Sequence, residues 1–565
     1  MTLLSIWIRD GTVPDPRRGG GGAFESAMRR SWMRLVEAWV DSGSKLRTHA
    51  TRCMSADAGK TSVRAHKAPR NTSIICTIGP ASEQIDQLRS VVGAGMNVMR
   101  CNFSHGQFDE QGPRIQNLRA ILKEINGEGN QPSPDLCGVA IDLKGPEIRT
   151  GLLQKSSKPK ALLESGKPFT LFTEENMRTK GSAEGVWIDY PLQKNIVPGM
   201  PVYIDDGLIH LEVMECRPDR IQCRIVNGGR LGEKKGVNVP GTKVDLPAIT
   251  EHDRSVLTWG AQQGADIVFA SFIRTAKDVA ELRDFLRSVS GGHMHIMSKI
   301  ENQEGLDNFD SILEESDGIM IARGDLGIEI PTEEVPFAQK MMTERSNRMG
   351  KPVACATQML ESMEDRPRPS RAEAGDVVNA VLQGSDLVML SGESANGKYP
   401  AITVQMMNQL CRRAELEQRN NPPSSVPTPS TLELLALRSL SSAAYAAAHS
   451  VPRNGLLILP ADQVQFAQKV ASFRPSCMVI CPTTSMHNAK QLLLYRGVQP
   501  LYVPEPLLYE HGIRDSSSEY QKDVLLASLA KEYAIQHGWV HPSTEALAAV
   551  HNNDPRLHVP ALTVL

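Results

Sequence analysis

The sequence predicts an α/β protein: a (β/α)8 TIM barrel with an inserted small β-barrel lid domain and a C-terminal α/β domain. The chain has 565 residues, which is enough for several domains. From residue 71 onward, short apolar runs alternate with amphipathic helical stretches, the pattern of parallel strands covered by helices. Eight such runs precede residue 412, and eight strand-and-helix repeats close into a barrel.

The barrel is expected over residues 71–145 and 247–417, with the lid inserted after its third strand. In this fold the chemistry lies at the rim where strands give way to the following loops. The eight strands are predicted at Ser73–Ile78, Asn97–Asn102, Gly138–Asp142, Asp266–Phe272, His295–Ile300, Gly318–Ala322, Val353–Ala356 and Leu387–Leu390.

The lid is predicted over residues 146–246. Apolar and polar residues alternate at 211–215 and again at 221–225, with Gly and Pro turns nearby, which is typical of short antiparallel strands. The sequence therefore predicts a small β domain over the barrel rim.

The segment after the barrel begins with a Pro- and Ser-rich linker at 418–429. Ser430 and Glu433 form a capping box that opens a helix to about residue 449. A separate α/β domain is expected over 430–565, with strands near Leu456–Leu459, Met478–Cys481 and Leu501–Val503.

The first 70 residues are basic, with 13 Lys and Arg against 6 Asp and Glu. Apolar residues between Met28 and Val40 share one helical face, as in organelle presequences, but acidic residues interrupt the pattern. We expect either a poorly ordered extension or a targeting segment. A cytoplasmic location is the first hypothesis, and mitochondrion or plastid is the alternative.

Charge and hydropathy exclude two classes of partner. The net charge of −2 provides no overall field for nucleic acid or anionic lipid. No run approaches 18 uncharged apolar residues, so a membrane span is not expected. The ten cysteines include no C-x-x-C pair and are expected to be reduced thiols in an intracellular compartment.

Polar residues follow the predicted strands where they end. Lys299 and Glu301 are two apart, so an extended strand points both side chains the same way. Glu301 and Asp325 follow neighbouring strands, and two carboxylates on one rim suit Mg²⁺, which takes its other ligands from water and substrate. The pattern predicts a magnesium site and a phosphate-bearing substrate.

The alternative interpretation of Lys299, Glu301 and Asp325 is a structural ion-pair network. Arg100, Arg149 and Thr357 are expected at the same rim, and six polar groups converging there favour a functional site.

The segment Gly392–Lys398 matches the G-x-x-x-x-G-K pattern of a phosphate-binding loop and follows a strand. Tyr399 stands where that loop needs Ser or Thr for magnesium, and Pro400 comes next. We interpret the segment as the loop that closes the eighth strand, with Pro400 starting the following helix.

The chain resembles the pyruvate kinase family over about residues 71–417, and more weakly to residue 565. The matching segments are IICTIGPAS from Ile74, NFSHG from Asn102, KGPEIRTG from Lys144, VFASFIR from Val268, SKIEN from Ser298, DGIMIARGDLGIEIP from Asp317, CATQMLESM from Cys355 and RPRPSRAE from Arg366. The resemblance implies transfer of a phosphoryl group from phosphoenolpyruvate to ADP, giving pyruvate and ATP, and a homotetramer.

The resemblance also implies roles for the rim residues. Arg100 would bind the phosphoryl group, since a guanidinium fork matches phosphate oxygens. Lys299 would stabilise charge on the moving phosphoryl group. Arg323 and Gly324 belong to a turn that faces the substrate carboxylate. Thr357 resembles the family's proton-relay threonine, which positions a proton for the enolate.

Metal and nucleotide ligands follow from the same resemblance. Glu301 and Asp325 would hold Mg²⁺ together with substrate oxygens, and Asp325 would also line the substrate site. Nucleotide contacts are implied for His105, Arg149, Lys235 and Asn102. Lid closure over ADP would exclude water from the reaction.

A potassium site is implied by Asn102, Ser104, Asp142 and the backbone carbonyl of Leu143, oxygen donors that suit a hard cation. Potassium-dependent members carry Thr at the position of Leu143. Because the implied ligand is the backbone carbonyl, the change of side chain need not remove it. Glu147 is the residue type of potassium-dependent members. We therefore expect stimulation by K⁺.

The C-terminal domain departs from the family at one loop. Members activated by sugar bisphosphates have a Ser-, Thr- and Gly-rich loop after the first strand of this domain. Here residues 460–465 read PADQVQ, without Ser, Thr or Gly, and Asp462 would repel phosphate. We expect no activation by fructose 1,6-bisphosphate.

Two alternatives to a working enzyme of this family were open from the sequence. The basic extension and the altered last domain are compatible with a non-catalytic paralogue acting as a scaffold or regulatory subunit. A second alternative is another metal-dependent barrel that performs carbon-carbon chemistry on phosphoenolpyruvate or pyruvate. The complete set of rim residues argues against the first, and the inserted lid against the second.

Overall fold

The computed structural model describes most of the chain from residue 69 onward: residues 69–104, 106–126, 132–134, 136–154, 160–420, 447–448, 451–452, 455–460, 464–514, 517–550 and 561–564. Several sequence predictions lie outside these residues. They are the extension at 1–68, the nucleotide contact His105, the helix opened by Ser430, and the loop residue Asp462.

Eight strands form a closed barrel in which every neighbouring pair is parallel. Their order around the barrel follows their order in the chain. The predicted fold class is therefore confirmed. The strands are β1 (Ser73–Thr77), β2 (Val98–Asn102), β3 (Gly138–Asp142), β12 (Ile267–Ala270), β13 (His295–Ile300), β14 (Gly318–Ala322), β15 (Val353–Ala356) and β16 (Leu387–Leu390).

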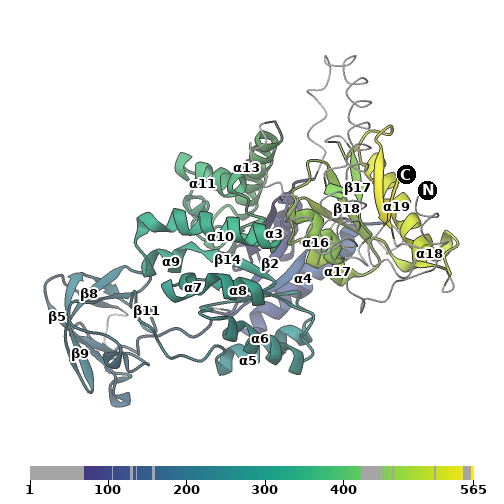
Figure 1. Ribbon diagram of the computed structural model, residues 1–565. Coiled ribbons are helices and arrows are strands. Elements are labelled where there is room, and N and C mark those ends of the chain that lie inside the picture. Colours follow the sequence, from purple (N-terminus) through teal and green to yellow (C-terminus); the bar gives the residue numbers. More distant parts are fainter. Residues whose placement is uncertain are drawn as a thin grey trace, which may run out of the picture. The chain divides into compact units, whose positions relative to one another are not determined.

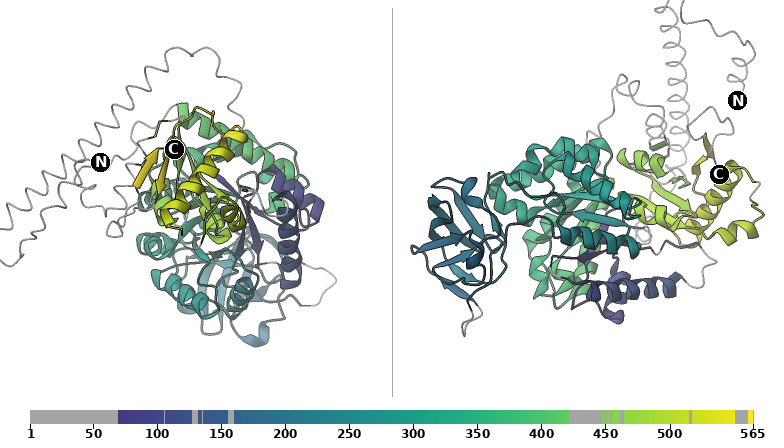
Figure 2. Two further views of the ribbon diagram at one scale, coloured as in Figure 1. Left: turned by 90° about the vertical axis from the view of Figure 1, so that its right-hand side faces the viewer. Right: turned by 90° about the horizontal axis from the view of Figure 1, so that it is seen from below.

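Helices surround these strands, as Figures 1 and 2 show. Three begin with a capping box, in which a Ser or Thr side chain and an acidic residue three positions on satisfy the first free amides. The barrel helices are α3 (Ile85–Ala94), α4 (Phe108–Asn126), α5 (Glu251–Gln262), α6 (Ala276–Ser288), α7 (Gln303–Asp307), α8 (Phe309–Glu315), α9 (Arg323–Glu329), α10 (Val335–Met349), α11 (Arg371–Gln383), α12 (Gly392–Ala395) and α13 (Pro400–Asn420).

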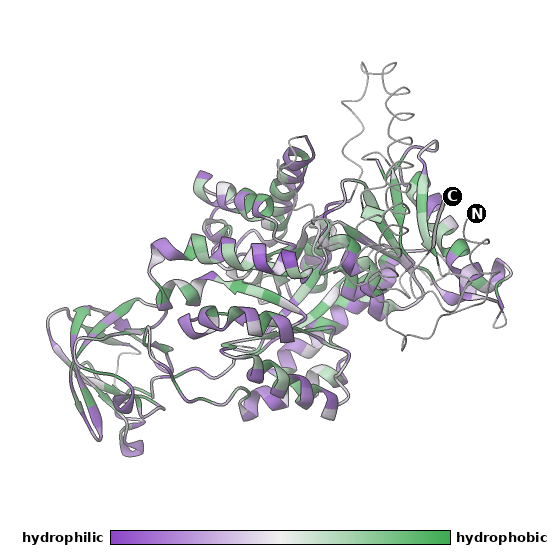
Figure 3. Cartoon of the chain, viewed as in Figure 1, coloured by the Kyte–Doolittle hydropathy of each residue, from purple (hydrophilic) through white to green (hydrophobic). Residues whose placement is uncertain are grey.

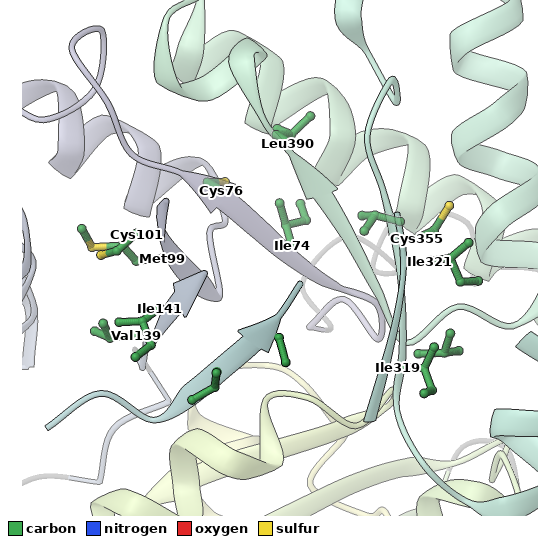
Figure 4. Close-up of a cluster of buried hydrophobic side chains, with 14 of the residues drawn as sticks. Ile74, Cys76, Met99, Cys101, Val139, Ile141, Ile319, Ile321, Cys355 and Leu390 are labelled. Carbon is green, nitrogen blue, oxygen red and sulfur yellow. The ribbon is translucent and has the colours of Figure 1, made fainter. Parts of the chain in front are cut away.

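Alternate residues of each barrel strand enter two different cores. Ile74 and Cys76 of β1 pack with helix residues such as Leu88 in the layer between strands and helices, part of which Figure 4 shows. Ile75, between them, belongs to the cluster that fills the barrel interior, together with Phe269. Each fully buried side chain of this size contributes about 1.5–3 kcal/mol. Figure 3 shows the resulting pattern of hydrophobic strands and hydrophilic outer helix faces.

The inserted segment forms a curled six-stranded sheet in the order β11-β7-β8-β9-β5-β6 and a separate pair, β10-β4. The two alternating segments predicted from the sequence lie in the antiparallel pair β8 and β9, whereas β5 and β6 pair in parallel. The strands are β4 (Ala161–Leu163), β5 (Pro168–Phe172), β6 (Gly185–Trp187), β7 (Pro201–Ile204), β8 (Ile209–Arg217), β9 (Arg220–Asn227), β10 (Gly229–Leu231) and β11 (Val237–Asn238).

The C-terminal domain is a five-stranded sheet in the order β19-β18-β17-β20-β21, parallel except for β21. Its strands are β17 (Leu456–Ile458), β18 (Met478–Thr483), β19 (Val498–Tyr502), β20 (Ala546–Val550) and β21 (Ala561–Val564), and its helices are α16 (Val464–Ser472), α17 (Met486–Leu492), α18 (Glu505–Glu510) and α19 (Glu519–Gln536).

Three further findings concern the described part of the chain. None of its helices has the length and apolar character that a membrane span needs. Its nine cysteines are all free thiols. The segment Gly392–Lys398 contains the short helix α12, and α13 starts at Pro400 as the sequence predicted.

Candidate active site at the carboxyl ends of the barrel strands

Five polar side chains continue the interior rows of the barrel strands. Each stands two residues after an interior apolar residue, as Ser271 follows Phe269, so the pleat points both the same way. Because the strands are parallel, these side chains gather at one rim. They are Thr77 of β1, Arg100 of β2, Asp142 of β3, Ser271 after β12 and Lys299 of β13.

Arg100 and Asp142 form a buried ion pair on neighbouring strands. The Arg100 Nε lies 2.5 Å from Asp142 Oδ2, and its Nη1 donates to Thr77 Oγ1 at 2.8 Å. Burial alone would raise the pKa of Asp142, but Arg100 and Lys299 lower it below its ordinary value. Asp142 is therefore a fixed anion between two cations.

The Lys299 ammonium has three partners. Its Nζ lies 2.7 Å from Ser271 Oγ, 2.9 Å from Glu301 Oε1 and 3.4 Å from Asp142 Oδ1. Burial alone would lower the pKa of Lys299, but Asp142 and Glu301 raise it above its ordinary value. Lys299 therefore stays charged, and the expected proximity of Lys299 and Glu301 is present.

The carboxylates of Glu301 and Asp325 lie near each other in different surroundings. Glu301 is 1% exposed, and its Oε2 accepts the Phe272 amide at 2.6 Å. Burial, followed by the charge of Glu301, raises the pKa of Asp325 to about 8. A cation beside the pair would remove this repulsion and keep both carboxylates ionised.

The donor set therefore fits a divalent cation that takes part of its shell from substrate. Among the described residues, no group of three or more His, Cys, Asp or Glu gathers as a complete metal cage. Two carboxylates with substrate oxygens are the usual arrangement for Mg²⁺. The rim carries two cations, Arg100 and Lys299, against the three carboxylates Asp142, Glu301 and Asp325, so one further positive charge is compatible with it.

Thr357 lies after β15 in a left-handed conformation, with φ of 69°. This conformation is strained for a β-branched residue. Its Oγ1 accepts the Gly324 amide at 2.7 Å and donates to the Ala356 carbonyl at 2.6 Å. Arg323 donates to the Thr357 carbonyl at 2.6 Å, and thus fixes the loop after β15 to the start of α9.

The residues of the implied potassium site lie on adjacent strand ends. Asn102 Oδ1 accepts the Ser104 amide at 3.0 Å, and the Phe103 amide donates to the Asp142 carbonyl at 3.0 Å. The Leu143 carbonyl accepts the Ser271 hydroxyl at 2.6 Å. An amide or carbonyl oxygen has two lone pairs, so these hydrogen bonds do not by themselves exclude a cation at Asn102 Oδ1 or the Leu143 carbonyl.

Arg149, which the sequence predicts at the same rim, and Lys235 of the lid form ion pairs with carboxylates other than those that Lys299 contacts. Arg149 Nη2 pairs with Glu147 Oε2 at 2.5 Å, and Lys235 Nζ pairs with Asp205 Oδ1 at 2.7 Å. The backbones of Arg149 and Gly236 are bridged, so both cations lie where the lid meets its connection to the barrel. The structure therefore gathers Arg100, Asp142 and Lys299 in one cluster and joins Arg149 and Lys235 to carboxylates of their own.

Two family models match the chain. The pyruvate kinase barrel domain matches residues 69–404, and the pyruvate kinase alpha/beta domain matches residues 438–551. The chain belongs to the pyruvate kinase family.

Pyruvate kinase PKLR of Homo sapiens is 45% identical over 450 residues, covering 78% of this chain and 76% of the relative. Pyruvate kinase 1 of Trypanosoma brucei brucei is 42% identical over 443 residues, covering 78% of this chain and 86% of the relative. Pyruvate kinase of Geobacillus stearothermophilus is 39% identical over 480 residues, covering 83% of this chain and 76% of the relative.

The enzyme class follows from this membership: the chain is a pyruvate kinase, a phosphotransferase of glycolysis. Neither the match nor the relatives favour the non-catalytic paralogue considered from the sequence. The carbon-carbon chemistry considered as a further alternative is likewise not the activity of this family.

Sequence analysis of this pyruvate kinase missed two residues of the rim, Ser271 and Thr77. Both are small hydroxyl residues at strand ends, and both contact a predicted catalytic cation. Both stand two residues after an interior apolar residue, Phe269 and Ile75, a spacing that places them on the interior face of their strands. Lys299 was predicted from a different signal, its two-residue spacing to Glu301.

Proposed function

We propose that this rim transfers the phosphoryl group of phosphoenolpyruvate to ADP and then protonates the enolate to pyruvate. Arg100 binds the phosphoryl group, since Thr77 and Asp142 hold its guanidinium and leave other N–H groups for phosphate oxygens. Arg323, Gly324 and the other residues of that turn face the substrate carboxylate. The observation that carries the proposal is the triple contact of Lys299.

Lys299 has three N–H groups and three acceptors of unequal strength. Its contacts with Ser271 and Glu301 are 2.7 and 2.9 Å, within the ordinary hydrogen-bond range, whereas the 3.4 Å contact with Asp142 is weak. The third N–H is therefore the one released to the moving phosphoryl group. Lys299 stabilises charge there without losing its two stronger anchors.

Glu301 and Asp325 are the proposed ligands of Mg²⁺. When bound there, Mg²⁺ would supply Lewis-acid stabilisation of the phosphoryl oxygens. Glu301 is oriented by the Phe272 amide. Asp325 is the carboxylate whose protonation is favoured in the absence of a cation.

Thr357 is the proposed proton-positioning residue. Its hydroxyl already donates to the Ala356 carbonyl and accepts from Gly324. It therefore orients a proton source, such as a water, and is not itself the acid, because an aliphatic hydroxyl is a poor proton donor at neutral pH.

Arg149 and Lys235, together with His105 and Asn102, are the proposed nucleotide contacts. Arg149 and Lys235 are ion-paired with Glu147 and Asp205, so nucleotide phosphates would compete with these carboxylates. Lid closure brings the two cations to ADP and excludes water.

K⁺ is the proposed monovalent cation, with Asn102, Ser104, Asp142 and the Leu143 carbonyl as ligands. Oxygen donors of this type suit a hard cation. Glu147, whose pKa is raised mainly by burial, lies beside Arg149 and adds negative charge to the region.

We further propose a homotetramer that acts in the cytoplasm, with mitochondrion or plastid as the alternative location. The proposed domain limits are those expected from the sequence, namely 1–70, 71–145 with 247–417, 146–246, 418–429 and 430–565. Size-exclusion chromatography with light scattering tests the oligomer. Mass spectrometry of the native protein from each cell fraction tests the location, since a shortened form confined to an organelle fraction would refute the cytoplasm.

The metal assignment is tested by Asp325→Ala, with Asp310→Ala as matched control. Asp310 is an exposed residue of α8 that pairs with Arg345 at 2.8 Å, away from the rim. We expect the magnesium concentration for half-maximal rate to rise at least about tenfold in Asp325→Ala, the loss of a charged ligand being equivalent to at least about 1.4 kcal/mol. It should stay unchanged in the control. An unchanged titration in both variants would identify Asp325 as a structural carboxylate.

A further inference from the structure

Ser271 follows β12 directly and is buried between the Lys299 ammonium and the Leu143 carbonyl. The residue is 4% exposed. Its Oγ lies 2.7 Å from Lys299 Nζ and 2.6 Å from the Leu143 oxygen, with Asp142 Oδ1 farther away at 3.4 Å. A single hydroxyl thus contacts three residues of the site.

The chemistry of the partners fixes the direction of these hydrogen bonds. An ammonium has donors only, so Ser271 Oγ accepts from Lys299. A carbonyl has acceptors only, so the Ser271 hydroxyl proton is donated to Leu143. The chain of hydrogen bonds runs from Lys299 through Ser271 to the Leu143 carbonyl, and Asp142 is left as the second acceptor within reach.

The next residue strengthens this arrangement. Phe272 has φ of 56°, a left-handed conformation that is uncommon outside glycine, and its amide donates to Glu301 Oε2 at 2.6 Å. Ser271 and Phe272 therefore hold Lys299 and Glu301 from one turn of the chain. Strain of this kind persists where the surrounding structure enforces it.

We propose that Ser271 is a positioning residue that holds Lys299 and couples it to the monovalent-cation site. This inference rests on the proposed potassium site, because the Leu143 carbonyl is one of its ligands. A carbonyl oxygen that also faces a cation is a weaker acceptor for the hydroxyl. Asp142 is also a proposed ligand of the cation, but its charged carboxylate remains a stronger acceptor than the neutral carbonyl. The Ser271 hydroxyl therefore turns toward Asp142 Oδ1, and that oxygen has less capacity for Lys299. The third N–H of Lys299 becomes available to the phosphoryl group.

The test is Ser271→Ala in the full chain, with Ser298→Ala as matched control. Ser298 is also buried and adjoins Lys299 in β13, but its hydroxyl contacts Ser316 at 2.6 Å on the other side of the strand. Three quantities are measured for each protein: kcat and KM for phosphoenolpyruvate, the ratio of kcat in K⁺ to kcat in tetramethylammonium, and the rise in melting temperature on adding K⁺ without substrate.

For Ser271→Ala we expect kcat in K⁺ to fall by about 10- to 100-fold, because a small displacement of a positioned group costs up to about 10²-fold. KM should stay within about threefold, as for an interaction made only in the transition state. The ratio of kcat in the two cations should fall toward one, while K⁺ still raises the melting temperature, since its other ligands remain. Ser298→Ala should match the wild type in all three quantities.

Two results would overturn the proposal. A wild-type cation ratio in Ser271→Ala would show that Ser271 does not couple the cation to Lys299. A fall in kcat equal to that of Ser298→Ala would show only general loss of packing. If K⁺ changes neither the rate nor the melting temperature of the wild type, the potassium assignment itself fails, and the coupling fails with it.

Discussion

Replacing Lys299 with methionine removes the charge at the centre of the proposed site while keeping an unbranched side chain that is one atom shorter. Among the residues that the structure describes, Lys299 is the one cation that contacts both Asp142 and Glu301. Removal of one positioned donor from a transition state costs on the order of 10²- to 10³-fold in kcat, or about 2.7–4 kcal/mol. We expect a loss of turnover in this range, with KM for ADP little changed.

The fold should survive this substitution. Removing one partner of a buried ion pair costs about 3–5 kcal/mol when the remaining charge has no other partner. Here Asp142 keeps Arg100 at 2.5 Å and Glu301 keeps the Phe272 amide at 2.6 Å. The loss in free energy of unfolding should therefore be at or below the lower end of that range, about 3 kcal/mol.

Turnover is measured with phosphoenolpyruvate and ADP in an assay coupled to lactate dehydrogenase, and unfolding in a denaturant titration. Lys340→Met is the control, because Lys340 lies exposed on α10 with its Nζ 3.9 Å from Glu344 Oε1. The control should be as active as the wild type. A folded Lys299→Met variant with turnover within threefold of the wild type would refute the role assigned to this ammonium.

Three further predictions follow from other residues. Thr357→Val leaves the Gly324 amide without its acceptor, so kcat should fall by about 10- to 100-fold, and the rate at which the methyl protons of pyruvate exchange with solvent should fall at least as much. Thr357→Ser keeps the hydroxyl and should retain most activity. Equal rates for both variants would contradict this role. Gly236→Ala places a Cβ 2.0 Å from the present position of Glu147 Oε1, so it should displace Glu147 from Arg149. In steady-state kinetics, KM for ADP should then change more than KM for phosphoenolpyruvate. Millimolar fructose 1,6-bisphosphate should not shift the phosphoenolpyruvate saturation curve, because each missing hydrogen bond to phosphate costs about 1.5–3 kcal/mol; a clear leftward shift would show that another loop binds it.

The barrel and the centre of its site were accessible from the sequence because both follow local rules. Buried parallel strands are short apolar runs, so the predicted Val353–Ala356 and Leu387–Leu390 match β15 and β16. The two-residue pleat related Lys299 to Glu301 without any knowledge of the neighbouring strands, and the 2.9 Å contact bears this out.

Contacts between distant strands could not be predicted from the sequence in the same way. The link from Ser271 to Leu143 depends on β12 lying beside β3, across the whole inserted lid. The pairing of Arg149 with Glu147 and of Lys235 with Asp205 depends on how the lid folds back on its own connection. Sequence spacing gives no register for such distant segments, so only the three-dimensional structure shows that Ser271 contacts Leu143 and Lys299.

Phosphorus NMR of the purified full-length chain with phosphoenolpyruvate and ADP tests the central claim most directly. In the presence of Mg²⁺ and K⁺, the phosphoenolpyruvate signal should disappear while the three signals of ATP grow in equal amount. Chelation of the divalent cation should stop the conversion, and adding Mg²⁺ back should restore it. A folded protein that leaves phosphoenolpyruvate unchanged, with both cations present, would contradict the account.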